Sequence, residues 1–316
     1  MTLGAEIAAA ISRGVGFVLA AQRADGAWTD WALPPGPSSD WTTAHVGLRL
    51  SGLGPRDRAA LAEPIDRAAR WLLSRQTERG GWGYNQAVEP DADSTAQVLL
   101  FFAAHGRPAP RGACAFLARH QQPDGGFATF RPDSLTGSWG LSHPEISSVA
   151  LLALHAHPGA LPEGSLSRGV TWLHRVRRSD GLWNSFWWSM PLPATEMSLA
   201  LLAALGTREP APTALAQWSS ADSLEAALVL SITADAGHCA RLELLARRLL
   251  AAQTDDGSWK SAPALRLTAR DCERPWEANS SGPLFADPQR LHSTATAVAA
   301  LSKAQRALTR MTGLSA

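Results

Sequence analysis

Two kinds of apolar segment alternate along the chain, and they predict two kinds of helix. In "PIDRAARWLLSRQ" (64–76), apolar residues fall on one stripe at helical spacing while charged residues lie off it, which is typical of a surface helix. In "STAQVLLFFAA" (94–104), small and apolar residues occupy every face, which indicates a helix buried on all sides. The stripe of the first segment consists of Ile65, Ala69, Leu72 and Leu73.

A short motif recurs between the two kinds of segment: a polar residue is followed, six positions later, by an aromatic one. A sixth pair of segments, 213–220 with 223–232, lacks this motif and has a very short connection. Repeats of this kind indicate helical hairpins that hide their apolar faces against their neighbours. We therefore predict an all-α fold, an (α/α)6 barrel of six helical hairpins forming one domain over residues 1–316. The five copies are "QRADGAW" (22–28), "QTERGGW" (76–82), "QQPDGGF" (121–127), "RRSDGLW" (177–183) and "QTDDGSW" (253–259).

The connections between predicted helices differ in a way that locates function. Links from inner to outer helices are short, rich in Pro and Gly, and free of aromatics, as in plain turns. Links from outer to inner helices are long and aromatic, so we expect function at that end. The alternative is that these rings only plug the barrel mouth. The long links carry Trp31, Trp41, Tyr84, Phe130, Trp139, Phe186, Trp187, Trp188, Trp276 and Phe285; the motif aromatics Trp28, Trp82, Phe127, Trp183 and Trp259 are expected to be structural.

Charge and cysteine content exclude some functions. The 316 residues include 29 Lys and Arg against 28 Asp and Glu, a net charge of +1 without a basic stripe, which argues against nucleic acid as a partner. Three widely spaced cysteines fit neither a disulfide framework nor a metal motif, so a cytoplasmic location is expected. Residues 1–22 carry Glu6 and Arg13 and are predicted to be a helix rather than a signal peptide. We expect a soluble chain with at most peripheral membrane contact.

Two aspartates, Asp91 and Asp93, directly precede one inner helix. Asp93 could simply be the N-cap of that helix. A second carboxylate and the apolar run that follows favour instead a neutral, protonated acid. Such an acid among aromatic faces is suited to protonating a carbon–carbon double bond and stabilising the resulting cation. When the inner helices are aligned on their apolar runs, the positions matching Asp93 are Trp41, Glu145, Thr195 and His292, His143 matches Asp91, and His45 lies one turn deeper.

The repeated turns, the hairpin pattern and "DADSTA" (91–96) resemble the class II terpenoid cyclases, a family that includes squalene-hopene cyclases and copalyl or drimenyl diphosphate synthases. The resemblance spans nearly the whole chain. The family's acid motif is D-x-D-D-T-A with the middle aspartate as proton donor, which implies Asp93 as the acid and Asp91 as its companion. Ser94 replaces the last aspartate. The triplet "TAH" (43–45) is similar to one that supplies a histidine beside the acid, although it precedes the acid motif here, and a core role for His45 is the alternative.

The resemblance implies protonation-initiated cyclisation of an acyclic prenyl diphosphate or related isoprenoid of farnesyl or geranylgeranyl size. The D-D-x-x-D cluster of ionisation-initiated synthases is absent. The family usually builds its pocket between two barrels, so a homodimer could complete a site here. Magnesium could assist diphosphate binding; no organic cofactor is expected. Expected substrate contacts are Trp41, Trp139, Trp187 and Trp188 for the cation, Glu145 and His292 in the ring around the acid, and Arg131, Lys260, Arg266, Arg270 and Arg290 for the diphosphate.

Three other functions stay open from the sequence. A carbohydrate-active α/α barrel would use paired carboxylates such as Asp93 and Glu145. A zinc-dependent prenyltransferase-like site would use Asp271, Cys272 and His292, although adjacent Asp and Cys suit one tetrahedral ion poorly. A barrel that binds an isoprenoid, a lipid or a protein without catalysis is the third.

Overall fold

The computed structural model describes residues 2–131, 136–207, 209–219, 222–236, 239–278 and 281–311. Helices dominate the described part, as the sequence predicts. The helices are α1 (Leu3–Ala20), α2 (Asp40–Leu50), α3 (Pro55–Arg75), α4 (Ala92–Ala104), α5 (Ala113–Ala118), η1 (Gly137–Gly140), α6 (Pro144–His155), α7 (Ser165–Arg175), α8 (Leu192–Ala204), η2 (Thr213–Gln217), α9 (Ser223–Ala236), α10 (Cys239–Ala251) and α11 (Leu291–Met311).

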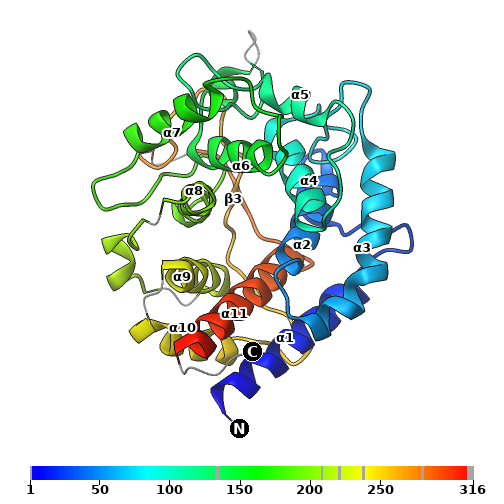
Figure 1. Ribbon diagram of the computed structural model, residues 1–316, viewed down its shortest axis with the longest axis vertical. Coiled ribbons are helices and arrows are strands. Elements are labelled where there is room, and N and C mark those ends of the chain that lie inside the picture. The colour runs from blue at the N-terminus through cyan, green and yellow to red at the C-terminus, as the bar shows by residue number, and fades with distance from the viewer. Residues whose placement is uncertain are drawn as a thin grey trace.

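The inner helices form a closed ring around a central axis (Figure 1). In this ring α2 contacts α4, α4 contacts α6, α6 contacts α8, α8 contacts α9, α9 contacts α11, and α11 returns to α2. The outer helices α1, α3, α5, α7 and α10 pack outside it against one or two inner helices each. The predicted arrangement of outer and inner helices is thus present among the described residues. The extent of one domain over residues 1–316 stays a prediction.

Burial separates the two kinds of helix as the patterns predict, with two differences. The inner helix α4 is buried from Ser94 to Phe102, whereas α1 buries one stripe that runs from Ile7 to Val18. On α3, Ile65, Ala69 and Leu72 are buried, but Leu73 is 49% exposed, because it lies at the edge of the stripe. The sixth outer segment forms only the short 3-10 helix η2 instead of an α-helix, and Ser220 lies outside the described residues.

The repeated motif ties each outer helix to the next inner helix. The indole N–H groups of Trp28, Trp82 and Trp183 each donate to a carbonyl ten residues earlier, at the end of the outer helix, with N···O distances of 2.8 Å. Gly26 makes the turn at φ +99°, and a Cβ there would lie 2.6 Å from the Arg67 carbonyl oxygen. The backbone N–H of each motif aromatic donates to a hydroxyl of the following inner helix; these hydroxyls belong to Thr43, Thr95, Ser147, Thr195 and Thr294.

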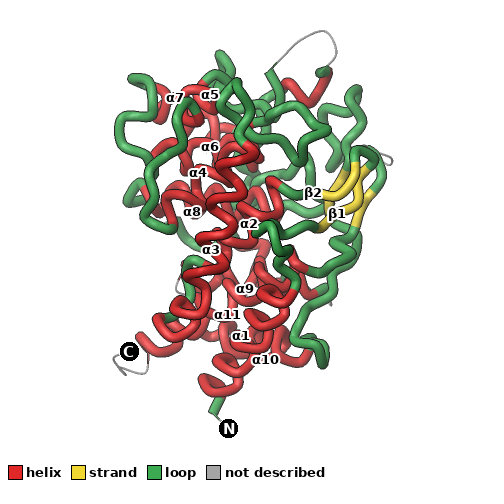
Figure 2. Tube along the Cα trace, turned by 90° about the vertical axis from the view of Figure 1, so that its right-hand side faces the viewer, coloured by secondary structure: helices red, strands yellow, loops and turns green. Residues whose placement is uncertain are grey.

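The long outer-to-inner connections gather at one end of the ring (Figure 2). There β1 (Asp30–Leu33) and β2 (Gly36–Ser38) form an antiparallel hairpin, and β3 (Leu265–Arg266) pairs with β4 (Leu284–Phe285). A further bridge joins Trp188 to Leu265. The aromatic loops are therefore cross-linked to one another by backbone hydrogen bonds rather than projecting singly into solvent.

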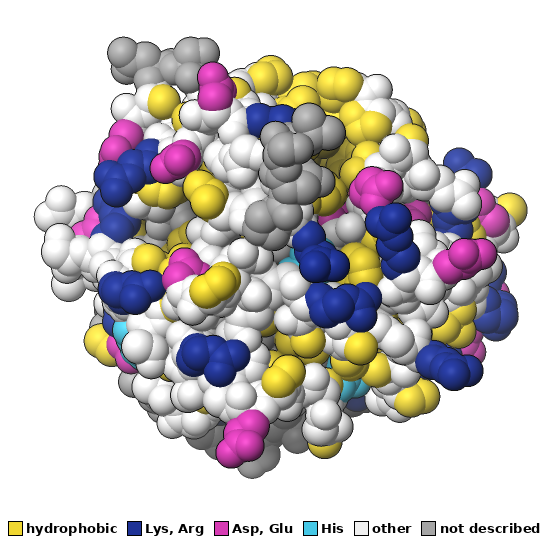
Figure 3. Space-filling model, turned by 90° about the horizontal axis from the view of Figure 1, so that it is seen from above, with side chains coloured by type: hydrophobic (Ala, Val, Ile, Leu, Met, Phe, Trp, Pro, Cys, Tyr) yellow, Lys and Arg dark blue, Asp and Glu magenta, His cyan; other side chains and the backbone are white. Residues whose placement is uncertain are grey.

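Helix α1 is long and apolar enough to cross a membrane and is the one such helix in the described part of the chain. It packs against α10 and α11, and 33% of it is buried. This burial and its single apolar stripe are those of an outer barrel helix. Viewed from above, basic and acidic side chains are interspersed over the surface (Figure 3), in line with the near-zero net charge.

Candidate functional site

A cavity of about 330 Å³ lies at the aromatic end of the barrel, within the size range of small-molecule sites. Its walls come from β1, the loops after α3, α5 and α7, the first turns of α2 and α4, and β3. Both aspartates of the acid motif reach it. The lining residues are Trp31, Leu33, Pro34, Pro35, Trp41, Tyr84, Val88, Asp91, Asp93, Ser94, Thr129, Phe130, Trp139, Trp187, Trp188, Leu265, Arg266 and Leu267.

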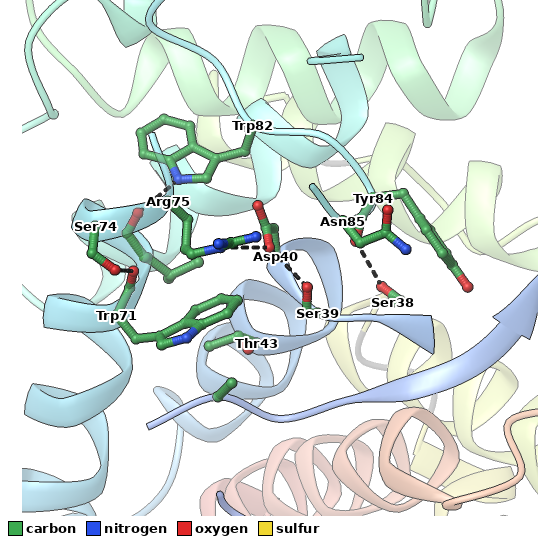
Figure 4. A network of polar contacts seen from close by, with 12 residues as sticks. Ser38, Ser39, Asp40, Thr43, Trp71, Ser74, Arg75, Trp82, Tyr84 and Asn85 are labelled. Atoms are coloured by element: carbon green, nitrogen blue, oxygen red, sulfur yellow. Dashed lines mark hydrogen bonds and ion pairs between the residues drawn. The ribbon is translucent and has the colours of Figure 1, made fainter. Parts of the chain in front are cut away.

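The β1–β2 hairpin, which supplies one wall, is fastened to the loop after α3. Tyr84 donates its hydroxyl to the Trp31 carbonyl at 3.1 Å, and Asn85 donates its amide to the carbonyls of Pro35 and Pro37. Close by, buried Asp40 accepts from Ser39 and lies 3.6 Å from the Arg75 guanidinium (Figure 4). These contacts fix the start of α2 and hold the hairpin as a wall.

Asp91, not Asp93, is the N-cap of α4. Its Oδ1 accepts from the backbone N–H of Ser94 at 2.7 Å, and its Oδ2 accepts from the Ser94 hydroxyl at 2.8 Å. The prediction that Asp93 serves only as the cap is therefore wrong, because extended backbone at Asp91 begins the helix two residues earlier. Ser94, which departs from the family motif, orients Asp91 without adding a third negative charge.

Asp93 lies in the first turn of α4 and is partly exposed to the cavity. Its Oδ2 accepts from the indole N–H of Trp41 at 2.9 Å. Burial raises the pKa of Asp93 to about 6, although hydrogen bonds from Trp41 and Gln97 oppose the rise. Burial also raises the pKa of Asp91 to about 8, and the nearby charge of Asp93 adds to the rise. Because ionising one carboxyl opposes ionising the other, the pair retains a proton near neutral pH.

Indole rings in the cavity wall and imidazole rings behind it pack against one another as a continuous cluster. Trp41 stacks on His45 with ring centroids 4.7 Å apart, and His292 lies 5.1 Å from Trp188. Trp31, at a left-handed φ of 48°, packs edge-on against Trp188. Aromatic faces attract cations, and they gain strength where water is excluded. The cavity thus joins protonatable carboxyls with surfaces that stabilise positive charge.

His45 and His292 support this wall from behind and are not among the residues that line the cavity. The Nε2 atom of His45 accepts from Arg49 Nε at 3.4 Å, and its ring packs on Trp41 and on His292. Burial lowers the pKa of both imidazoles, so both are neutral. His45 therefore reaches the acid indirectly, through Trp41, whose indole N–H binds Asp93, and through Gln97, which interacts with both His45 and Asp93.

Glu145 is buried near the acids but outside the lining. Its Oε1 accepts the backbone N–H groups of Phe186 and Trp187, and burial raises its pKa to about 7. It therefore does not form, with Asp93, a pair of carboxyls lining one open groove, as the carbohydrate-active alternative requires. Thr95 and Thr195 occupy equivalent positions, because the hydroxyl of each accepts the backbone N–H of the preceding motif tryptophan. The residue that corresponds to Asp93 is therefore Pro193, and the sequence alignment that placed Thr195 there is wrong in α8.

Of the expected cationic contacts, Arg266 alone lines the cavity among the described residues. Arg131 is exposed, and Lys260 is exposed as well. Arg270 lies over the Trp139 ring, with 4.6 Å from Cζ to the centroid, and Arg290 pairs with Asp256 at 2.9 Å. A cluster of cations for a diphosphate is therefore not brought together at the cavity.

Several lining residues were not selected from the sequence. Trp31, Tyr84 and Phe130 belong to the aromatic loops and could have been found by that signal. Leu33, Pro34 and Pro35 carry no such signal, because only the hairpin brings them to the wall. Gln97 was also missed; it lies one helical turn after Asp93, on the face of α4 that carries the acid, and a regular i, i+4 spacing would have found it.

Comparisons with known proteins bear on this geometry. No family model matches the chain. It is 32% identical over 48% of its length to the drimenyl diphosphate synthase of Streptomyces showdoensis, and the match covers 29% of that protein. It is 26% identical over 71% of its length to the drimenyl diphosphate synthase of Streptantibioticus cattleyicolor, with 48% of that protein covered. The matches thus span less than half the length of these curated relatives.

A solved structure extends the likeness to the whole fold. A variant of the type II terpene cyclase MstE from Scytonema, with geranylgeranyl dihydroxybenzoate bound, superposes with a TM-score of 0.83 at 26% identity, over 96% of this chain and 99% of that one. In sequence and in fold, the chain is thus similar to the class II terpenoid cyclases. The resemblance deduced from the acid motif and the repeated turns is confirmed.

The predicted metal ligands are not brought together in the structure. Within the described residues, no three His, Cys, Asp or Glu side chains are grouped so as to hold an ion. Asp271, Cys272 and His292 are therefore not assembled as zinc ligands, and the expected role of Mg²⁺ in diphosphate binding is not supported by a ligand group in this part of the chain.

Proposed function

We propose that the protein cyclises an acyclic isoprenoid of farnesyl or geranylgeranyl size by protonating its terminal double bond. The observation that carries this proposal is a carboxyl, Asp93, whose pKa burial raises to about 6 and which faces an aromatic cavity. A carboxylic acid is a weak acid, so it can protonate an alkene at a useful rate only where the site stabilises the carbocation that forms. The indoles of Trp41, Trp187 and Trp188 line the same cavity and supply that stabilisation.

The roles divide between the two aspartates. Both aspartates line the cavity, but Asp93 is the more exposed of the two and is the donor, while Asp91 is almost fully buried and is held in place by both Ser94 contacts. Asp91 acts as a positioning residue that keeps a proton in the pair. Trp41 orients the Asp93 carboxyl through its N–H, and His45 orients Trp41 by stacking. After ring closure a base removes a proton from the carbocation, which quenches its positive charge and leaves a carbon–carbon double bond in the product.

The proposal is supported by a cyclase structure whose chain matches this barrel over nearly its whole length. The substrate complex of MstE is matched over 99% of its chain, and the substrate named in it, geranylgeranyl dihydroxybenzoate, carries a geranylgeranyl chain. The names of several curated relatives specify a diphosphate as the compound that they make, as in drimenyl diphosphate synthase. A homodimer, a peripheral membrane contact and a cytoplasmic location stay predictions.

Replacement of Asp93 by Asn tests the assignment. The purified wild-type protein and D93N are incubated with geranylgeranyl and farnesyl substrates, and extracted products are analysed by mass spectrometry. We expect D93N to lose roughly 10²-fold or more of its cyclisation rate, the usual contribution of a general acid. Asp40→Asn is the matched control, since Asp40 is a buried carboxyl in the first turn of α2 that does not line the cavity. Unchanged cyclisation by folded D93N would reject the proposal.

A further inference from the structure

Arg266 is a buried cation without an anionic partner. Its side chain lies at the cavity wall on β3, and the residue is 7% exposed. Its Nη1 donates to the Phe186 carbonyl at the long distance of 3.5 Å. No carboxylate of the described residues lies within ion-pair distance of it. Buried charges in proteins are usually paired, because desolvating an isolated cation is costly.

Glu145, the carboxylic acid that acts electrostatically on Arg266, does not form an ion pair with it. Glu145 influences Arg266 electrostatically, but its Oε1 is engaged by two backbone N–H groups of the loop after α7. Burial raises the pKa of Glu145 to about 7, so much of it is neutral at neutral pH. Burial also lowers the pKa of Arg266, which reflects a guanidinium removed from water without full compensation. The positive charge therefore remains available to a ligand in the cavity.

The single positive charge at the cavity wall limits how much negative charge the head group of such a ligand can have. Arg266 is the one Lys or Arg among the described lining residues, and the grouped acids that would recruit a metal counter-ion are missing from the same part of the chain. One guanidinium neutralises one carboxylate through two parallel hydrogen bonds. A diphosphate would keep excess negative charge in a poorly solvated cavity whose two aspartates already resist ionisation.

We propose that Arg266 binds a single carboxylate at the head of the substrate, so that the protein cyclises a prenylated carboxylic acid in preference to a prenyl diphosphate. This inference rests on the proposed cyclisation and specifies its substrate class. Arg266 thereby positions the chain with its head at β3 and its far end toward the acid. Binding the carboxylate also compensates the buried guanidinium, which couples affinity to head-group charge.

Three substrates with the same chain test the inference: a geranylgeranylated hydroxybenzoic acid, its methyl ester, and geranylgeranyl diphosphate. For the wild-type protein we expect kcat/KM to be at least roughly tenfold higher for the acid than for the ester, since the ester cannot form the charge-assisted pair. Arg266→Gln should lower kcat/KM for the acid by a similar factor, mainly through KM, and leave the ester unchanged. Arg266→Lys should restore part of the loss. Arg131→Gln, which alters an exposed arginine at the same end, is the matched control.

The outcomes separate the two proposals. Faster cyclisation of the diphosphate than of the acid, or an equal loss for acid and ester in R266Q, would overturn the head-group assignment and leave cyclisation intact. Circular dichroism and thermal unfolding of R266Q distinguish loss of the contact from loss of the fold. If the wild-type protein cyclises none of the three substrates and D93N behaves identically, the proposed function itself fails.

Discussion

Two buried carboxylic acids in this barrel have opposite electrostatic environments. Asp93, at the aromatic end, has an indole N–H as its geometric partner, and burial raises its pKa to about 6. Glu196, on α8, accepts two hydrogen bonds from Arg49 at 3.0 and 2.7 Å, and lies 3.9 Å from Lys303. Burial alone would raise the pKa of Glu196, but these charges outweigh it and hold the pKa at about 2.

The difference shows that one fold can hold one buried carboxylic acid ionised and keep a proton on another pair. Glu196 is ionised and compensated, so it holds α2, α8 and α11 together. The Asp91–Asp93 pair is left without a cation, so it keeps a proton at a cost to stability. Beside Arg49 and Lys303 lies a second cavity of about 200 Å³, which is lined by basic and aliphatic side chains and has no indole in its wall, in contrast to the cavity around Asp93.

The largest expected effect comes from removing Glu196. Glu196→Ala leaves Arg49 buried without its partner, and breaking such a pair costs about 3–5 kcal/mol of unfolding free energy. Denaturant unfolding at pH 7 measures it. Asp235→Ala, which removes an exposed partner of Lys303, serves as the control and should cost at most about 1 kcal/mol. An equally small loss in both variants would show that the Glu196 pair does not hold the helices together.

The pH dependence of stability should differ in sign between the two acids. Asp91 and Asp93 have folded pKa values above the unfolded value of 3.8, so the native state binds more protons and its stability falls as pH rises from about 4 to about 8. Glu196 has a lowered pKa, so its contribution is present above its unfolded pKa of 4.5 and is lost as pH falls toward 2. We expect Asp91→Asn, which keeps an N-cap, to recover on the order of 2 kcal/mol at pH 8.

Thermal unfolding of the wild-type protein and D91N between pH 5 and 8.5 checks this expectation. The cyclisation rate should depend on the protonation of the same aspartate pair, and it should decline toward alkaline pH because the acid must be protonated to donate. The assignment of a raised pKa to this pair would be contradicted if the wild-type protein became more stable from pH 5 to pH 8 and D91N showed the same pH dependence.

A smaller effect should come from the hydrogen bond that favours the ionised form of Asp93. Trp41→Phe removes the indole N–H, worth about 1 kcal/mol or somewhat more for a charged acceptor, and keeps an aromatic face. The pKa of Asp93 should rise by about one unit, so the alkaline limb of the rate profile should move upward by a similar amount. Trp188→Phe keeps the Asp93 contact and is the control. A profile shifted equally in both variants would assign the effect to lost cation stabilisation instead.

The repeats made most of the fold predictable, because spacing alone identifies helices that are amphipathic or apolar throughout. The place of Asp93 at the cavity was predictable for the same reason, because this residue directly precedes an apolar run. The cations were not, since Arg131, Arg266, Arg270 and Arg290 share the long loops, and only the β3–β4 pairing decides that Arg266 points inward. The alignment failed at Thr195 because the apolar run of α8 does not begin at the same distance from the helix start as the run of α4: Asp93 is the second residue of its helix, whereas Thr195 is the fourth.

The smallest expected effect concerns the glutamine side chains in the repeated turns that connect outer to inner helices. Gln76 donates to the carbonyls of Gly80 and Arg111, which links one hairpin to the next, whereas Gln122 donates only to the nearby His120 carbonyl. Gln76→Ala should lower unfolding free energy by about 1 kcal/mol, Gln122→Ala by less, and neither should change the alkaline limb of the rate profile. These hydrogen bonds lie outside the cavity and away from the Glu196 pair. A change in the pH profile of the rate in either variant would therefore mean that the turns influence the pKa of Asp93. The environments of Asp93 and Glu196 would then be less independent of the surrounding structure than their direct contacts indicate.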